Sequence, residues 1–325
     1  MFVTFILIKT IIMKILLSNN HFTQVGGSET WTYSMALNLH KLGHEVDLFI
    51  DVDFNRENNI FLSNIHFKSS INIFTVNPPV RQYDLIIANH TSTINKLINV
   101  YSPEIIIQTC HQSLHALEQP HPVIKNFVSV SKEVQQHLKN KGLDSVLIEN
   151  SIDCELFANS RPINERLRSV LSLAQGSKAA NMIQQACDSM NLQFIQRSKW
   201  DNYTLNIQDE INQADLVVSV GRGALESLGC GRNVISLDSR MYYTSTPLGY
   251  GLLDSEEKIK QALSDNFTGR NGGQTFTTEK LIDEFKKYRK QYGVMGRNYI
   301  LNNHNIIDDI NKYLCFLDKN NQKHG

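Results

Sequence analysis

The sequence predicts an α/β protein built from two doubly wound parallel-sheet domains and ending in a helical C-terminal tail. Its 325 residues are enough for about two domains, each with its own buried core. Short apolar strands alternate with helical stretches in two successive series, which is the pattern of parallel sheets covered by helices. A polar, irregular stretch over residues 150–164 separates the two series and indicates the interdomain linker.

Composition excludes several classes of protein. Lysine plus arginine total 32 and aspartate plus glutamate total 32, so the formal net charge is +0 and no overall positive field would hold the chain on nucleic acid. With 41% hydrophobic and 20% charged residues, the composition is that of a globular protein and not of a disordered one. The five cysteines are dispersed without a C-x-x-C pair, which argues against a disulfide framework or a zinc knuckle. We therefore expect a cytoplasmic protein without a nucleic-acid partner.

The first domain is expected over residues 13–155. Residues 13–17 form an apolar first strand, and a glycine loop leads into a helix whose apolar side chains recur at three- and four-residue spacing up to Gly43. A second strand follows at once over residues 46–50, and this order is the opening of a doubly wound sheet. Further buried strands are expected at residues 85–88, 105–107, 127–130 and 146–148.

Residues 1–12 precede the first strand and are expected to be a dispensable extension, because Met13 begins a complete buried strand. The stretch 1–17 is apolar, but Lys9 and Lys14 interrupt it well short of the roughly 20 residues that span a bilayer. No small-residue cleavage site of a signal peptide follows it. An interfacial anchor is the alternative, so peripheral membrane contact stays open.

The second domain is expected over residues 156–295. The remaining residues, 296–325, are expected to form a C-terminal helical tail that packs back on the first domain, with its last helix around residues 306–316. Strands of the second domain are expected at residues 169–173, 192–195, 216–220 and 234–237, and helices at 178–190 and 224–228.

Four short segments resemble the motifs of one enzyme family. They are GGSE at residues 26–29, VSVSKEV at 128–134, NSID at 150–153 with Phe157, and ALESLGCG at 224–231. In order and spacing they resemble the GT-B nucleotide-sugar glycosyltransferases, and among them the retaining family four. The resemblance implies two Rossmann-like domains facing a cleft, of which the first binds the acceptor and the second binds the donor nucleotide.

The activity that the resemblance implies is transfer of a hexosyl group from a nucleoside diphosphate sugar to a hydroxyl of an unknown acceptor, such as a glycan or a lipid. The implied reaction is metal-independent and uses no cofactor besides the nucleotide-sugar donor. Asp51 and Asp53 have the D-x-D spacing of a metal site in another glycosyltransferase fold. Because they follow a Rossmann-like strand here, we expect a polar loop and no metal site.

A glycine-containing loop in the second domain is the candidate donor site. Gly221, Arg222 and Gly223 stand between a strand and a helix, where free backbone N–H groups and the helix dipole receive a diphosphate. We expect Arg222 to add a bidentate cationic contact. The resemblance gives Glu226 the role of accepting hydrogen bonds from the donor ribose. The alternative is a tight structural turn with a solvated acid at the start of the helix.

The other candidate residues come from both domains. Gly26 and Gly27 are expected to let a ligand approach the backbone at the cleft, and the resemblance gives Lys178 a contact with the donor diphosphate. A structural turn and a surface lysine are the alternatives. His111 directly follows an expected strand, at the edge where open α/β sheets bind ligands, and the resemblance makes it the candidate catalytic residue that contacts the donor sugar. His90 has the equivalent place one unit earlier, and a structural role is the alternative for both histidines.

Two positions depart from the family pattern. Val218 stands where the resembling family has a second glutamate, eight positions before Glu226, and residues 173–175 replace an expected arginine. These departures leave retention or inversion of configuration open and keep a non-catalytic sugar-nucleotide-binding subunit as an alternative. An NAD-dependent oxidoreductase is a further alternative, because Gly221 and Gly223 form half of a G-x-G-x-x-G motif in which Glu226 takes the third glycine position.

Overall fold

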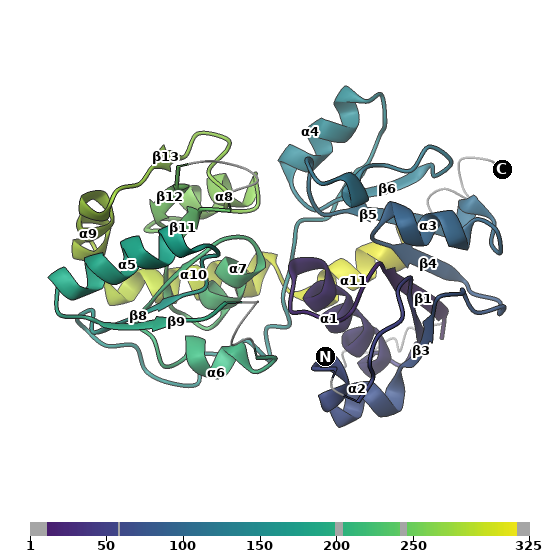
Figure 1. Cartoon of the computed structure of the whole chain (residues 1–325), viewed down its shortest axis with the longest axis horizontal. Helices are drawn as coiled ribbons and strands as arrows, with labels where there is room; N and C mark the ends of the chain where they lie inside the picture. Colours follow the sequence, from purple (N-terminus) through teal and green to yellow (C-terminus); the bar gives the residue numbers. More distant parts are fainter. Residues whose placement is uncertain (1–11, 58, 199–203, 241–245, 317–325) are drawn as a thin grey trace, which may run out of the picture.

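The computed structural model describes residues 12–57, 59–198, 204–240 and 246–316, which form two α/β domains (Figure 1). Of the extension expected over residues 1–12, all but Ile12 lies outside the described residues. The predicted fold class is confirmed, because each domain contains a sheet dominated by parallel strands and covered by helices.

The sheet of the first domain has 7 strands, all parallel, in the order β3-β2-β1-β4-β5-β6-β7. The chain therefore starts at an inner strand and is wound outward to both edges, as in doubly wound folds. The edge strand β3 is not predicted from the sequence because its four residues are only partly buried and lack an apolar run. The strands are β1 (Lys14–Asn19), β2 (Glu45–Ile50), β3 (Asn72–Thr75), β4 (Leu85–Ala88), β5 (Ile106–Cys110), β6 (Asn126–Ser129) and β7 (Val146–Leu147).

The helices of the first domain begin and end at the residues that local chemistry favours. The first of them starts after Gly26 and is followed by Gly43, whose φ of 92° lies in the left-handed region that glycine adopts without strain. Ser131 caps another by accepting a hydrogen bond from the Val134 N–H at 3.3 Å. The helices are α1 (Gly27–Lys41), α2 (Ile65–Ser70), α3 (Thr91–Leu97) and α4 (Lys132–Asn140).

The sheet of the second domain has 6 strands in the order β13-β12-β11-β10-β8-β9. Four are parallel, whereas β12 and β13 are antiparallel additions at one edge that the sequence pattern does not predict. Glycine makes this edge possible, because a Cβ on Gly249 would lie 2.0 Å from the Ser236 carbonyl oxygen. The strands are β8 (Ser169–Ser172), β9 (Gln193–Gln196), β10 (Leu216–Ser219), β11 (Asn233–Asp238), β12 (Leu248–Leu252) and β13 (Gln274–Thr275).

The helices of the second domain cover this sheet, and the chain then returns to the first domain. α10 packs on α7 so closely that a Cβ on Gly296 would lie 2.6 Å from the Leu228 side chain. α11 crosses over and packs beside α1, drawn in yellow in Figure 1, where Ile310 and Tyr313 join the core of the first domain. The helices are α5 (Ser177–Ser189), α6 (Ile207–Ile211), α7 (Arg222–Gly229), α8 (Glu256–Leu263), α9 (Thr278–Lys286), α10 (Lys290–Asn303) and α11 (Ile306–Leu314).

None of the helices in residues 12–316 that the structure describes combines the length and the apolar character needed to cross a membrane.

Candidate functional site

Two adjoining cavities lie between the domains, at the carboxyl ends of the parallel strands. One has a volume of about 250 Å³ and is bordered by the start of α7; we call it the α7 cavity. The other, of about 330 Å³, contains four histidines, and we call it the histidine cavity. Both cavities are lined by a shared set of residues from the two domains, namely Gly27, Gln175, Arg222, Arg240 and Asn266.

A larger hollow of about 1420 Å³ lies at the opposite edge of the first sheet. Lys14, Glu45 and Asn72, the first residues of β1, β2 and β3, are among its lining. Because open α/β sheets bind ligands at the carboxyl ends of their strands, we place the candidate site at the two cavities and not at the larger hollow.

The turn into α7 has the conformation of a glycine loop. Gly221 has a φ of 61°, in the left-handed region, and precedes the first residue of the helix. A Cβ on Gly223 would lie 2.5 Å from the Ser219 hydroxyl oxygen, so a side chain at this position would displace Ser219. The α7 cavity is bordered here by the first backbone N–H groups of the helix and elsewhere by polar and apolar side chains; the apolar ones include Leu156, Phe157, Leu173, Leu205 and Val220.

Arg222 and Glu226 form a buried ion pair at this helix start. The Arg222 Nε lies 2.9 Å from the Glu226 Oε1, and the side chains are only 8% and 10% exposed. Burial raises the pKa of Glu226, and the Arg222 guanidinium opposes this rise. Arg222 also donates to the Ser151 carbonyl oxygen at 3.0 Å and to the Ser34 hydroxyl oxygen at 2.8 Å. The guanidinium therefore connects the start of α7 to the linker and to α1 of the first domain.

The other predicted donor-site residues differ in their relation to the cavities. Gly26 precedes α1, and a Cβ there would lie 2.3 Å from the Glu29 carboxylate, whereas Gly27 has open space beside it and lines both cavities. Lys178 lies in the first turn of α5, is exposed, and is not part of the lining of either cavity. The structure thus brings the predicted glycines, Arg222 and Glu226 together but leaves Lys178 outside.

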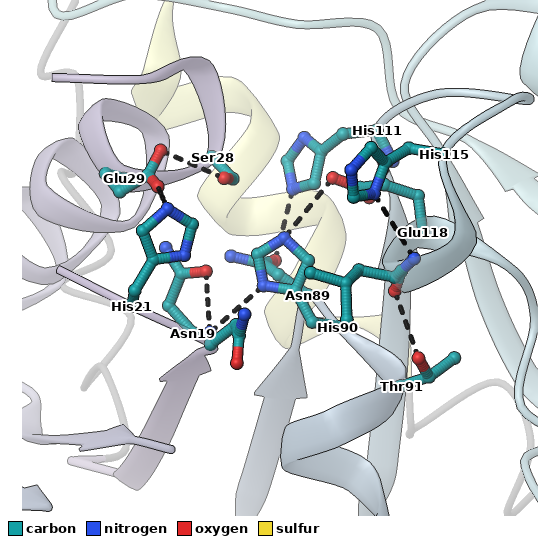
Figure 2. A network of polar contacts seen from close by, with 12 residues as sticks. Asn19, His21, Ser28, Glu29, Asn89, His90, Thr91, His111, His115 and Glu118 are labelled. Atoms are coloured by element: carbon teal, nitrogen blue, oxygen red, sulfur yellow. Dashed lines mark hydrogen bonds and ion pairs between the residues drawn. The ribbon is translucent and has the colours of Figure 1, made fainter. Parts of the chain in front are cut away.

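His111 lies in the histidine cavity, directly after β5 (Figure 2). Its Nε2 is 3.1 Å from the Asn89 Oδ1, and the Asn89 amide nitrogen donates to the Thr32 hydroxyl oxygen at 2.8 Å. The Asn89 oxygen must therefore be the acceptor, so the His111 Nε2 carries the hydrogen. Burial lowers the pKa of His111 to about 4. At neutral pH the ring is uncharged and its Nδ1 holds a lone pair that can accept a proton or a hydrogen bond.

Glu118 is a central residue of this cavity that was not predicted from the sequence. Its buried carboxylate lies 3.3 Å from the His90 Nε2 and accepts a hydrogen bond from the His111 backbone N–H at 3.1 Å. The Asn20 N–H donates to the His90 Nδ1 at 3.1 Å, which gives His90 the tautomer with a hydrogen on Nε2. Burial alone would raise the pKa of Glu118, but the hydrogen bonds from the His90 ring and from the His111 backbone N–H bring it below its usual value. Glu118 follows no strand or motif, so no sequence signal marks it.

His21 and Glu29 form a second histidine–carboxylate pair at the same edge (Figure 2). The His21 Nε2 lies 3.0 Å from the Glu29 Oε1, and the Ser28 hydroxyl donates to the Glu29 Oε2 at 3.1 Å. Burial would raise the pKa of Glu29, but the hydrogen bond and charge of His21 lower it overall. His21 follows the end of β1 by two residues, so the criterion that selects His90 and His111 also selects it.

Two further predictions concern acidic side chains. Among the described residues, no three histidine, cysteine, aspartate or glutamate side chains are grouped so that they could hold a metal ion. Asp51 instead forms an ion pair with the Lys96 Nζ at 2.6 Å, and Asp53 is exposed. Val218, at the position of the missing family glutamate, is fully buried inside the second sheet and does not reach either cavity.

Comparisons with known proteins identify the architecture. No family model matches the sequence, and no curated protein matches it. Among solved structures, a glycosyltransferase from Rickettsia africae matches with a TM-score of 0.58 at 14% identity, over 95% of this chain and 98% of that one. TarM from S. aureus matches with a TM-score of 0.59 at 8% identity, over 94% of this chain and 100% of that one. UDP-GlcNAc 2-epimerase from Neisseria meningitidis matches with a TM-score of 0.54 at 12% identity, over 94% and 100%.

These likenesses show that the chain has the GT-B fold, as the four sequence segments predict. At such low identities they establish the fold alone. The closer resemblance to the retaining family four stays a prediction.

Proposed function

We propose that this protein transfers a hexosyl group from a nucleoside diphosphate sugar to an acceptor hydroxyl in the space between its two domains. The observation that carries the proposal is the junction of two chemically different cavities at the strand ends of both sheets. One cavity offers apolar walls and a helix N-terminus, and the other offers neutral and carboxylate-paired histidines. TarM and the epimerase were crystallised with UDP and with UDP-GlcNAc, respectively, which supports a nucleotide sugar as the ligand.

In the proposed complex the nucleoside occupies the α7 cavity and the diphosphate lies at the start of α7. The free backbone N–H groups after Gly221 and the positive end of the helix favour a phosphate there. Glu226 accepts hydrogen bonds from the ribose, for which it must exchange part of its contact with Arg222. Electrostatic stabilisation of the departing diphosphate is then the main catalytic contribution of this domain.

The transferred sugar and the acceptor occupy the histidine cavity in this proposal. His111 faces them as a neutral ring, and its Nε2–H is held by Asn89. Glu118 fixes the His111 backbone and the His90 ring, so these groups keep their positions while the sugar moves. We propose that neither a metal nor a cofactor besides the donor takes part, and that the protein works in the cytoplasm, where its thiols stay reduced.

The experiment that tests the proposal has two stages. Calorimetric titration with UDP, GDP, ADP and NAD identifies the nucleotide that the protein binds. Release of that nucleotide from its sugar conjugates is then measured with candidate acceptors, with and without EDTA. We expect binding of one nucleoside diphosphate and turnover that EDTA does not abolish; binding of NAD alone would contradict the proposal, and turnover that needs added Mn²⁺ would contradict metal independence.

A second candidate function, a non-catalytic sugar-nucleotide-binding subunit, rests on one observation. The position of the second family glutamate is the buried Val218, so this chain offers no carboxylate to the sugar from that place. Such a subunit would bind the nucleotide sugar without releasing nucleotide from it under any acceptor condition.

A further inference from the structure

The surface shared by the two cavities contains two cations, Arg222 and Arg240. A diphosphate at the start of α7 would lie against this shared surface, because Gly221 and Arg222 begin the helix there. Lys178, to which the sequence resemblance gives the diphosphate contact, is exposed outside both linings. The cation that meets the diphosphate is therefore to be sought among the two arginines.

Arg222 is committed to other contacts. Two of its guanidinium nitrogens donate hydrogen bonds, to the carbonyl oxygen of Ser151 and to the hydroxyl of Ser34, and its Nε lies 2.9 Å from the Glu226 carboxylate as an ion pair without a hydrogen bond. Moving this side chain onto a phosphate would leave the mostly buried Glu226 carboxylate without its counter-ion. That exchange is unfavourable because an unpaired buried charge is destabilising.

Arg240 is positioned differently, by the end of β11. The buried Asp238 carboxylate accepts from the Arg240 Nε at 2.8 Å, from its Nη2 at 2.7 Å and from its backbone N–H at 3.1 Å. This bidentate contact fixes the plane of the guanidinium. The Arg240 side chain is 20% exposed, so its head is oriented by a rigid strand end and still reaches the cavities.

The loop beside Arg240 is tied to the loop that precedes α5. The Ser239 hydroxyl donates to the Gln175 carbonyl oxygen at 2.6 Å, and Gln175 lines the same junction. Gly176 has a φ of 100°, and a Cβ there would lie 3.5 Å from the Ser239 carbonyl oxygen. The loops after β8 and β11 are thus held together at the junction of the two cavities, and Arg240 lies on the surface that they form.

We propose that Arg240 binds the diphosphate of the donor, in the role that the sequence resemblance gives to Lys178. This inference rests on the proposed function and deepens it. The ligand proposed for Arg240 is a nucleoside diphosphate. The interaction is a charge-assisted hydrogen bond between the oriented Arg240 guanidinium and the phosphate oxygens. Asp238 is the positioning residue for Arg240.

The test compares a nucleoside diphosphate with its nucleoside. UDP and uridine, or the pair whose diphosphate the wild type binds, are titrated into the wild type and into Arg240→Gln, Arg240→Lys and Lys178→Gln. Arg166→Gln serves as the matched control, because Arg166 is an exposed arginine of the same domain outside both cavity linings. Denaturant midpoints of all variants are measured alongside.

We expect Arg240→Gln to lower the affinity for the diphosphate about tenfold or more while the affinity for the nucleoside stays within about twofold. Arg240→Lys should give an intermediate loss, because it keeps the charge and loses the planar fork. Lys178→Gln and Arg166→Gln should both stay close to the wild type.

Two results would overturn the inference while the proposed function stands. One is a diphosphate affinity of Arg240→Gln equal to that of the wild type, and the other is a loss of nucleoside affinity of the same size as the loss of diphosphate affinity. If the wild type binds no nucleoside diphosphate at all, the proposed function fails and the inference fails with it.

Discussion

At the scale of single residues, the Arg222–Glu226 pair links folding to the candidate donor site. Both side chains are almost wholly buried, and Arg222 also reaches Ser34 and Ser151. From the sequence, both side chains are expected to contact a ligand, with a solvated acid as the alternative for Glu226. In the structure the two side chains form an ion pair with each other, and Glu226 is buried and not solvated. A variant at either position therefore changes stability as well as binding, and the two effects must be separated.

We expect Glu226→Ala to lower the free energy of unfolding by about 3 kcal/mol, because it leaves the Arg222 guanidinium buried without its counter-ion. The double variant Arg222→Met, Glu226→Leu should regain most of this loss, since it removes both charges. Urea denaturation of the three proteins checks the coupling. A double variant that is no more stable than Glu226→Ala would show that the loss does not come from the unpaired charge of Arg222.

The binding role of Glu226 is measured in Glu226→Gln, which keeps the shape of the side chain. If Glu226 accepts hydrogen bonds from the ribose, the loss of its charge should weaken nucleotide binding about tenfold. Calorimetric titration with the nucleotide that the wild type binds measures this change. An unchanged affinity in a variant that folds normally would remove Glu226 from the donor site.

His111 is expected to act on the transferred group and not on the nucleotide, because it lies in the histidine cavity and outside the α7 cavity. His111→Ala should therefore lower kcat about tenfold or more while nucleotide affinity stays within about twofold. His66→Ala, at an exposed histidine on α2, is the control. Unchanged turnover at saturating donor would show that His111 has only a structural role.

At the scale of elements, α11 holds the end of the chain on the first domain. Asn305 precedes it and pairs with Ile152 of the linker, where the Ile152 N–H donates to the His304 carbonyl oxygen at 3.1 Å and the Ile306 N–H to the Ile152 carbonyl oxygen at 2.9 Å. The chain thus passes between the domains twice at neighbouring places. Because these two connecting segments are hydrogen-bonded to each other, they limit how far the two domains can separate at this side.

A second contact joins the domains at the histidine cavity. Arg270 donates to both oxygens of the Glu133 carboxylate, at 2.9 Å and 2.7 Å, and the Glu133 N–H donates to the Ser264 carbonyl oxygen at 2.9 Å. The start of α4 in the first domain is thereby bound to the end of α8 in the second. Opening of the histidine cavity requires this contact to break.

The contribution of α11 is tested at Ile310, which is fully buried in the core of the first domain. Ile310→Ala should lower the free energy of unfolding by about 3 kcal/mol, because it leaves a cavity that the surrounding side chains fill only in part. Leu301→Ala on α10 is the matched control, since Leu301 is 38% exposed, and should change stability by less than about 0.5 kcal/mol. Equal effects of the two substitutions would show that α11 is not an integral part of that core.

At the scale of the whole molecule, the sequence predicts most of the architecture and only part of the site. Continuous apolar runs such as that of β4 identify the inner strands, because parallel strands are buried on both faces. The edge strands β3 and β13 and the inner strand β12 next to β13 do not meet this criterion, since they are short, partly exposed or rich in glycine.

The same contrast holds for the site. The histidines that follow β4 and β5 are predictable, because strand order places their side chains at one edge of the sheet. Glu118 and Arg240 are not predictable in this way. Glu118 ends the short 3₁₀ helix Ala116–Glu118, which does not directly follow a strand. The relation of Arg240 to the cavities depends on how the two domains meet. Contacts across the domain boundary have no local pattern in the sequence.

The pH dependence of stability is the last property that belongs to the whole molecule. Burial lowers the pKa of His111 and of His304 to about 4 in the folded protein, whereas an exposed histidine in the unfolded chain has a pKa near 6.5. Between these values the unfolded chain binds protons that the folded protein does not. Stability therefore rises with pH in this window: the contribution is complete above about pH 6.5 and is lost as the pH falls toward 4. The raised pKa values of Glu226 and Asp309 act in the opposite direction, so the histidine contribution must be isolated with a variant.

His304→Gln is the suitable variant, because His304 is buried and lines neither cavity. The His304 Nδ1 lies 3.1 Å from the Asn150 carbonyl oxygen, and a glutamine amide can also donate to that oxygen. We expect the wild type to lose more stability than His304→Gln when the pH falls from 7 to 5, by about 1–2 kcal/mol. Both proteins release His111 on unfolding, but only the wild type also releases His304, which then takes up a proton. Urea midpoints and m-values at pH 7, 6 and 5 measure the difference. Parallel stability curves for the two proteins would show that His304 titrates alike in the folded and unfolded states, and that its burial between the linker and α11 leaves its protonation unchanged.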